Sequence, residues 1–208
     1  MRGTIVVLAT LLGLGIAASL PAANAQSPRT PPVRVRGTID AFSGQTLTVK
    51  TRGGALVAVA LTPNFAVHSV VRKHLSDIHD GDFVASTSVR GKNGNLHAIE
   101  VHIFMPAQRG VVPEGQFPWD LAPHSLMTNA VVSGLGTVKA GRIVTVTYAG
   151  KSVDVEVDRN TPIVAYAPGD PGMLKRGHAV FIIAAKKPDG TLTTANVTVE
   201  SKGVKPPM

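Results

Sequence analysis

The sequence predicts an all-β protein of two tandem five-stranded barrels, and three observations support this fold class. Residues 57–104 align without a gap on residues 153–200, at an offset of 96 positions, with identities at turn glycines and alternating aliphatic residues. Short runs alternate between apolar and polar residues, which is the period of a half-buried strand. Pairs that contain glycine separate these runs, as tight hairpins require. We therefore expect one small module built twice.

Residues 1–25 have the features of a secretory signal peptide. Arg2 supplies a basic start, an apolar run covers residues 5–20, and residues 23–25 read Ala-Asn-Ala, a small-residue cleavage signal. The run is short for a membrane span, and the rest of the chain has no apolar stretch of about 18 residues. We expect a periplasmic or secreted bacterial protein with no membrane span in its mature chain. Residues 26–32, which are rich in proline, should form an extended leader.

The composition excludes several kinds of site. The chain has no cysteine, which rules out disulfides, thiolate metal sites and a cysteine nucleophile. Its net charge is +8, and no run of basic residues is longer than two. A basic surface of this kind suits contact with an anionic polymer of the cell envelope, or it serves solubility alone. We expect no nucleic acid as a partner, because both the expected exported location and the lack of aromatic residues interleaved with the basic ones disfavour it.

The first module, residues 33–104, contains the signals of five strands. Residues 46–50 and 99–103 alternate, and pairs that contain glycine, at 43–44, 53–54 and 93–94, mark the hairpin turns. Between Leu61 and Phe83, residues 74–78 can form one or two helical turns. The order of three strands, a short helix and two strands is typical of a barrel of the OB type. An SH3-like barrel and an open sheet are the alternatives.

The second module, residues 131–200, repeats this order. Residues 143–147 and 153–157 alternate, and a short helical turn is expected at 171–175. The tail, residues 201–208, contains proline and lysine and is expected to be disordered.

The connector, residues 105–130, contains the only tryptophan of the chain, Trp119. Phe117, Trp119 and Leu121 concentrate apolar bulk in a segment that otherwise has the composition of a loop. Long loops of this kind are commonly functional or packed down by their own side chains. The connector therefore either holds the two barrels together or binds a ligand or partner through Phe117, Trp119 and Asp120. Disorder is the third alternative.

A family resemblance rests on the turn and strand residues of the first module. They are Gly37-Thr38-Ile39, Gly44, Leu47-Thr48-Val49, Leu75 with Ile78, Gly81-Asp82 and Gly94-Asn95-Leu96. This pattern resembles a bacterial exported family of domains of unknown function, small β-barrels that often occur as repeats behind signal peptides. Some members are labelled metal transporter permeases. The resemblance implies a small barrel and no established activity. The second module departs from the pattern at residues 176–178.

Histidine and methionine suggest an alternative function as a periplasmic copper- or zinc-binding protein. Five of the seven histidines lie in the first module, and none of their counterparts at the 96-residue offset is histidine. His102 with Met105, and His124 with Met127, share His-x-x-Met spacing, and imidazole with thioether suits Cu(I). With His97, these four residues form the candidate metal site, which would have to be assembled through space.

No sequence motif indicates catalysis. The chain has no Gly-x-Ser-x-Gly elbow, no His-Glu-x-x-His motif and no glycine-rich phosphate loop. We therefore expect no enzyme and no cofactor. The predicted function is a non-enzymatic binding or scaffolding module of the bacterial cell envelope, with an envelope protein or an anionic envelope polymer as partner.

Overall fold

The computed structural model describes residues 31–92 and 94–206, which are built almost entirely of strands. The expected signal peptide and most of the leader lie outside the described residues. Within the described ranges, no helix has the length and apolar character needed to cross a membrane.

The first half of the chain forms five strands, as the sequence predicted. They are β1 (Val33–Ser43), β2 (Thr46–Thr51), β3 (Leu56–Lys73), β4 (Phe83–Arg90) and β5 (Leu96–Ile103). We expected the third strand to end near Leu61, but it continues to Lys73. One turn of 3-10 helix, η1 (Leu75–Asp77), follows it.

The second half repeats these elements in the same order. Its strands are β7 (Leu126–Val138), β8 (Gly141–Tyr148), β9 (Lys151–Asp158), β10 (Ile163–Pro168), β11 (Ala179–Lys186) and β12 (Leu192–Val199). The turn η3 (Pro171–Met173) starts 96 residues after η1, and β11 and β12 start 96 residues after β4 and β5. β9 and β10 together are the counterpart of the long β3. Between the halves lie η2 (Pro106–Gln108) and β6 (Gly115–Pro118).

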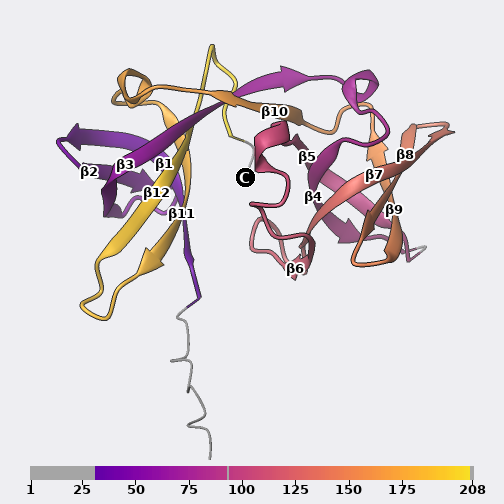
Figure 1. Ribbon diagram of the computed structural model, residues 1–208, viewed down its shortest axis with the longest axis horizontal. Coiled ribbons are helices and arrows are strands. Elements are labelled where there is room, and N and C mark those ends of the chain that lie inside the picture. Colours follow the sequence, from indigo (N-terminus) through magenta and orange to yellow (C-terminus); the bar gives the residue numbers. More distant parts are fainter. Residues whose placement is uncertain (1–30, 93, 207–208) are drawn as a thin grey trace, which may run out of the picture.

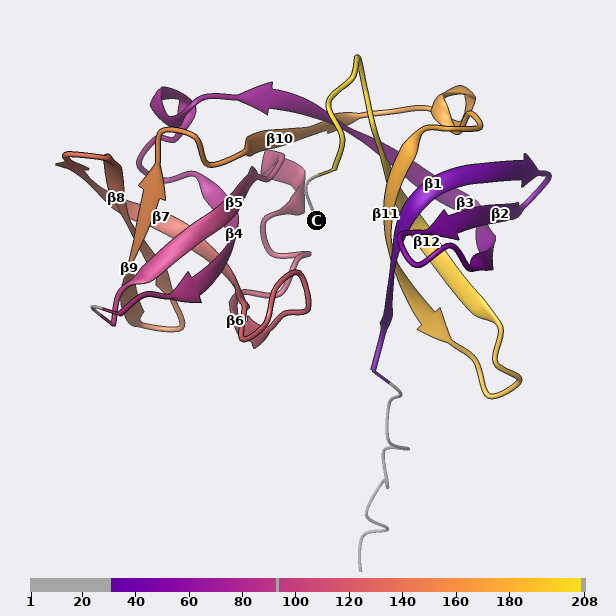
Figure 2. The same ribbon diagram turned by 180° about the vertical axis from the view of Figure 1, so that it is seen from behind.

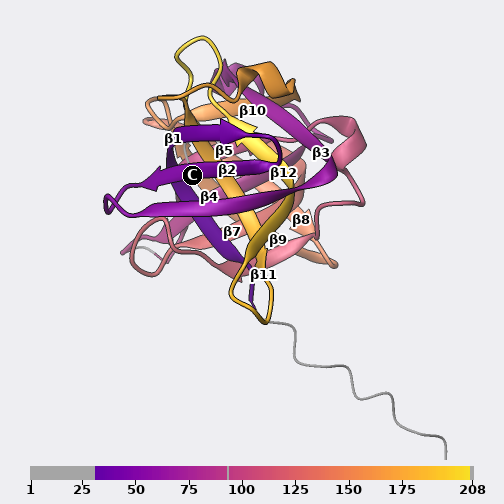
Figure 3. The same ribbon diagram turned by 90° about the vertical axis from the view of Figure 1, so that its left-hand side faces the viewer.

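The strands pair across the two halves, which differs from the tandem arrangement expected from the sequence. β1 pairs with β2, and β2 with β3, but β3 then pairs with β12, β12 with β11, and β11 with β1. This closed ring of five strands is the β1 barrel. Figure 3 shows the molecule with the β1 barrel facing the viewer.

The other five strands form the complementary ring, the β7 barrel. β7, β8 and β9 pair in order, β9 pairs with β5, β5 with β4, and β4 with β7. Each barrel therefore takes three strands from one half of the chain and two from the other. Figures 1 and 2 show the two lobes, with β3 and β10 running between them.

The two copies meet where β3 pairs antiparallel with β10. Val70 lies opposite Tyr166, and these two residues are themselves 96 positions apart. The pairing is therefore arranged about an approximate two-fold axis at this point. Its two ends are equivalent places in the two copies: Lys73 lies opposite Ile163 at one end, and at the other the Gly169 N–H donates to the Val67 carbonyl (2.9 Å).

Each barrel encloses its own aliphatic core. One cluster of buried residues lies within the β1 barrel and a second within the β7 barrel. The residue that directly follows each 3-10 turn packs into one of these cores: Ile78 is buried in the β7 core and Leu174 in the β1 core. Gly81 and Gly177 follow with φ of +85° and +86°, a backbone conformation that glycine adopts without strain.

Cleavage of the connector tests the strand exchange. A protease site inserted after Val111, which is 77% exposed, would cut the chain between its halves. Because each barrel needs strands from both halves, we expect the fragments to stay together in size-exclusion chromatography and to separate only in denaturant.

Refolding of the separated fragments gives the decisive measurement. Each fragment alone should lack a cooperative unfolding transition, and equimolar mixing should restore it. Two fragments that unfold cooperatively on their own would contradict the exchanged pairing.

Truncation of the residue that closes the β7 barrel tests its core. Ile78→Ala removes a side chain that is 1% exposed, and we expect it to lower the free energy of unfolding by about 2–5 kcal/mol. Leu135→Ala, at a position 41% exposed in the same barrel, is the control and should cost well under half as much. Urea denaturation measures both values, and equal losses would contradict the assigned core.

Candidate functional site

The connector joins the two barrels. β6 pairs with β7, and a turn in which Ser125 Oγ donates to the Ala122 carbonyl (2.8 Å) holds the segment that follows. The backbone N–H of Trp119 donates to the carbonyl of Ser125 (2.8 Å). The indole ring then reaches the β1 barrel, where its centroid lies 3.9 Å from the Arg34 guanidinium carbon and 6.4 Å from the Phe181 ring.

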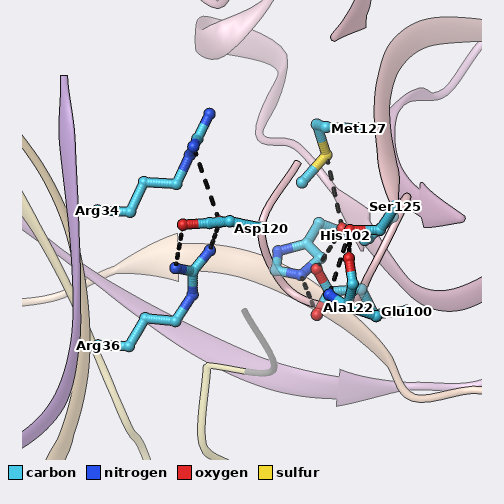
Figure 4. Close-up of polar contacts among 9 residues, drawn as sticks. Arg34, Arg36, Glu100, His102, Asp120, Ala122, Ser125 and Met127 are labelled. Carbon is cyan, nitrogen blue, oxygen red and sulfur yellow. Dashed lines mark hydrogen bonds and ion pairs between the residues drawn. The ribbon is translucent and has the colours of Figure 1, made fainter. Parts of the chain in front are cut away.

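Asp120 strengthens this connection. Arg36 donates two hydrogen bonds to its carboxylate, at 2.8 and 3.2 Å, and Arg34 lies 3.7 Å away (Figure 4). Burial raises the pKa of Asp120, but the hydrogen bond from Arg36 and the charges of both arginines outweigh it, so the pKa lies below the ordinary value of 3.8. We call Trp119, Asp120, Arg34, Arg36 and Phe181 the connector latch.

The three residues proposed to bind a partner therefore differ in their surroundings. Trp119 and Asp120 contact the β1 barrel within the same chain. Phe117 is 38% exposed, and its ring lies against Gly115, where a Cβ atom would be 2.8 Å from the ring. These contacts agree with the first alternative for the connector, a staple between the barrels.

The five candidate metal ligands have different surroundings, although two of them, His102 and Met127, lie near each other around Glu100. His97 lies 3.3 Å from Glu156, His102 is fully buried, and His124 is exposed at a turn with φ of +58°. The Met105 backbone N–H donates to the Gln108 side chain, and Met127 Sδ lies 3.8 Å from the Thr87 hydroxyl oxygen. Among residues 31–92 and 94–206, no three His, Cys, Asp or Glu side chains are placed to hold a metal ion.

His102 belongs instead to a buried polar cluster. Thr87 Oγ1 donates to Glu100 Oε1 at 2.5 Å, and Glu100 Oε2 lies 3.5 Å from His102 Nε2 (Figure 4). His102 Nδ1 is 3.3 Å from the Tyr166 hydroxyl. Glu100 and His102 are 1% and 0% exposed, so this cluster joins β4, β5 and β10 and is closed to a dissolved ligand.

Sequence reasoning missed the buried state of this cluster. Glu100 and His102 occupy the polar positions of an alternating strand, which normally face solvent. Here β10 pairs alongside β5 and carries Tyr166 over that face. Burial, together with the charge of Glu100, raises the pKa of Tyr166 above its usual range, so its hydroxyl stays protonated.

An open cavity lies at one end of the β3–β10 pairing. This crossover cavity has a volume of 580 Å³. Its polar lining consists mainly of cationic and neutral side chains, namely Arg72, Lys73, His74, Arg159, Asn160, Thr161 and Lys205. No carboxylate lines it among the described residues, and within these residues Arg72, Lys73, Arg159 and Lys205 form no salt bridge.

A second cavity lies against the β1 barrel. This β1 cavity has a volume of 450 Å³, and its basic side chains come from β1, β2, the turn after β2 and the tail: Arg36, Lys50, Arg52 and Lys205. It too is lined by no carboxylate among the described residues. Arg36 is already paired with Asp120, so its charge is compensated. Lys205 lines both cavities.

The tail that carries Lys205 has a defined turn, in contrast to the expected disorder. Ser201 and Val204 exchange backbone hydrogen bonds of 2.8 and 3.0 Å. Lys202 and Gly203 between them have φ of +48° and +77°, as in the tight turns of hairpins. Pro206 is buried, and residues 207–208 lie outside the described residues.

The two copies differ in basic residues as well as in their histidines. Within the aligned residues 57–104 and 153–200, Pro168, Gly169 and Pro63 stand at the positions that match the crossover residues Arg72, Lys73 and Arg159. The opposite end of the β3–β10 pairing is packed: a Cβ on Gly169 would lie 3.1 Å from Val67 and 3.3 Å from Met173 Sδ. Comparison of charges between the aligned copies is the sequence signal that could have revealed the crossover cavity.

The latch gives a pH-dependent contribution to stability. The folded-state pKa of Asp120 is lowered, so its contribution is complete above the ordinary carboxyl value of 3.8 and is lost as the pH falls through the lower folded value. We expect Asp120→Asn to reduce the free energy of unfolding by about 0.5 kcal/mol at neutral pH, the range of exposed ion pairs. The difference from the unsubstituted protein should vanish in strong acid.

Urea denaturation between neutral pH and strong acid measures this difference. In an Arg36→Gln background the effect of Asp120→Asn should shrink. A difference that stays constant with pH would show that the ion pair does not stabilise the fold.

Comparison with known proteins finds no match: no protein-family model, no curated protein and no solved structure is similar to this chain. The family named in the sequence analysis therefore stays a prediction.

Proposed function

We propose that this protein is a non-enzymatic, exported binding module of the bacterial cell envelope, and that its partner is an anionic envelope polymer. The crossover cavity carries this proposal. Four cationic side chains, Arg72, Lys73, Arg159 and Lys205, line a space of 580 Å³, with no carboxylate in the lining among the described residues. The signal-peptide features of residues 1–25 support export.

Electrostatics favour an anion in this space. Like charges that line one cavity repel one another, and the surrounding low-dielectric walls concentrate their field. A phosphate or carboxylate group relieves the repulsion. Arg72 and Arg159 have planar guanidinium groups that can donate two parallel hydrogen bonds to either group.

The lining favours a polymer over a folded protein. Protein interfaces are enriched in aromatic residues, and neither cavity is lined by Phe, Tyr or Trp among the described residues. The exposed large apolar residues, Leu56, Val71, Val111, Phe117, Leu135 and Ile183, also lie outside both linings.

Removal of two arginines tests the proposed function. Arg72→Ala combined with Arg159→Ala should weaken binding of long-chain inorganic polyphosphate and of polygalacturonate at least 10-fold, because it removes both guanidinium groups of the cavity. Isothermal titration calorimetry measures the affinities. Binding should weaken with added salt, since the Debye length falls from about 30 Å at 0.01 M to about 8 Å at 0.15 M.

The matched control carries the same change of charge elsewhere. Lys151→Ala combined with Lys186→Ala removes two exposed charges outside both cavities, and we expect less than a 2-fold change. Uncharged dextran should not bind. If both double variants lost affinity equally, binding would depend on net charge alone, which would refute a defined site. If neither polyanion bound, the proposed function would be refuted.

A further inference from the structure

We infer that the crossover cavity and the β1 cavity are two subsites of one track, and that the ligand is a linear polymer with an anionic group, phosphate or carboxylate, on each repeating unit. This inference rests on the proposed function and specifies its ligand. The polymer crosses the tail at Lys205 and occupies both cavities at once.

Lys205 provides the connection between the subsites. It lines both cavities, so they adjoin the same short segment of the tail. The tight turn at 201–204 and the buried Pro206 hold this segment on either side of Lys205. The lysine is thereby placed to contact a chain that passes from one cavity to the other.

The elements around the two subsites are otherwise different. The crossover cavity is built from the end of β3 and the segment that leads from β9 into β10. In the β1 cavity, Lys50 lies at the end of β2 and Arg52 in the turn that directly follows the strand, so both come from one short segment of the chain. Val49 between β1 and β3 is fully buried, which places Lys50 on the outer side of the barrel.

The β1 subsite also indicates which chemistry it accepts. Asp120 places a carboxylate on Arg36, a residue of this cavity, and both oxygens accept hydrogen bonds from the guanidinium group. An anion of the same kind is therefore already bound at the margin of the track, supplied by the chain itself. Lys50, Arg52 and Lys205 extend the basic surface beyond it.

Two subsites on one framework make affinity depend on ligand length. A single small anion fills one cavity, whereas a chain that reaches both gains an effective concentration for its second contact. Gains of about 10²–10⁴ are typical of such linkage. Charge density alone would not produce a step in affinity at the chain length that reaches both cavities.

A length series tests the inference. Triphosphate, mid-length and long-chain polyphosphate are titrated against the full mature chain, with affinities expressed per binding site to remove the statistical effect of length. Galacturonate oligomers of matched length form the carboxylate arm. We expect an affinity increase of at least 100-fold between triphosphate and a chain that spans both cavities, in at least one arm; the arm with the larger increase identifies the anionic group.

Variants assign the threshold to the two cavities. Lys50→Ala with Arg52→Ala should abolish the length-dependent gain and leave triphosphate binding at the crossover cavity within 2-fold. Lys205→Ala should reduce the long-chain affinity at least 10-fold. Circular dichroism and thermal unfolding confirm that each variant is folded.

The outcomes separate the two proposals. Binding of triphosphate and long chains with equal affinity per site overturns the two-subsite track and leaves the proposed function intact. Loss of the length-dependent gain in the Lys151→Ala with Lys186→Ala control would overturn the track as well. No binding of any anion overturns both.

Discussion

The exchange of strands between the two halves is the constraint on which the rest of the structure depends. β3 finds its parallel partner in β12, and β9 finds its partner in β5, so neither half can close a ring alone. A strand without its partner would leave backbone N–H and C=O groups unpaired, which is costly where water is excluded. Because of the exchange, β3 and β10 run antiparallel between the two barrels, and the crossover cavity lies at one end of this pairing.

The local elements could be predicted from the sequence, but the pairing could not. Alternation in 46–50, 99–103 and 153–157 identified strands, and the 96-residue offset placed them correctly in both halves. The choice between a module that closes on itself and one that exchanges strands is not encoded in that alternation. Both arrangements bury the same faces against equivalent neighbours, since the two copies carry similar aliphatic residues at equivalent positions.

The site was predictable only in part, for related reasons. Trp119 and Asp120 were singled out because the connector concentrates aromatic and proline residues, and both do contact the opposite barrel. The basic cavities escaped notice because Arg72, Arg159 and Lys205 are far apart in sequence and converge only through the exchange. The histidines, conspicuous by number, are distributed over separate surroundings, and His102 serves a buried network with Glu100 and Tyr166.

The approximate two-fold axis at Val70 and Tyr166 has a consequence for the two ends of the β3–β10 pairing. If two identical chains paired about such an axis, both ends would have to be the same. A single chain that supplies both strands is free of that requirement. One end therefore carries Arg72, Lys73 and Arg159 while the other is sealed by Gly169 against Val67 and Met173, an asymmetry that identical chains could not hold.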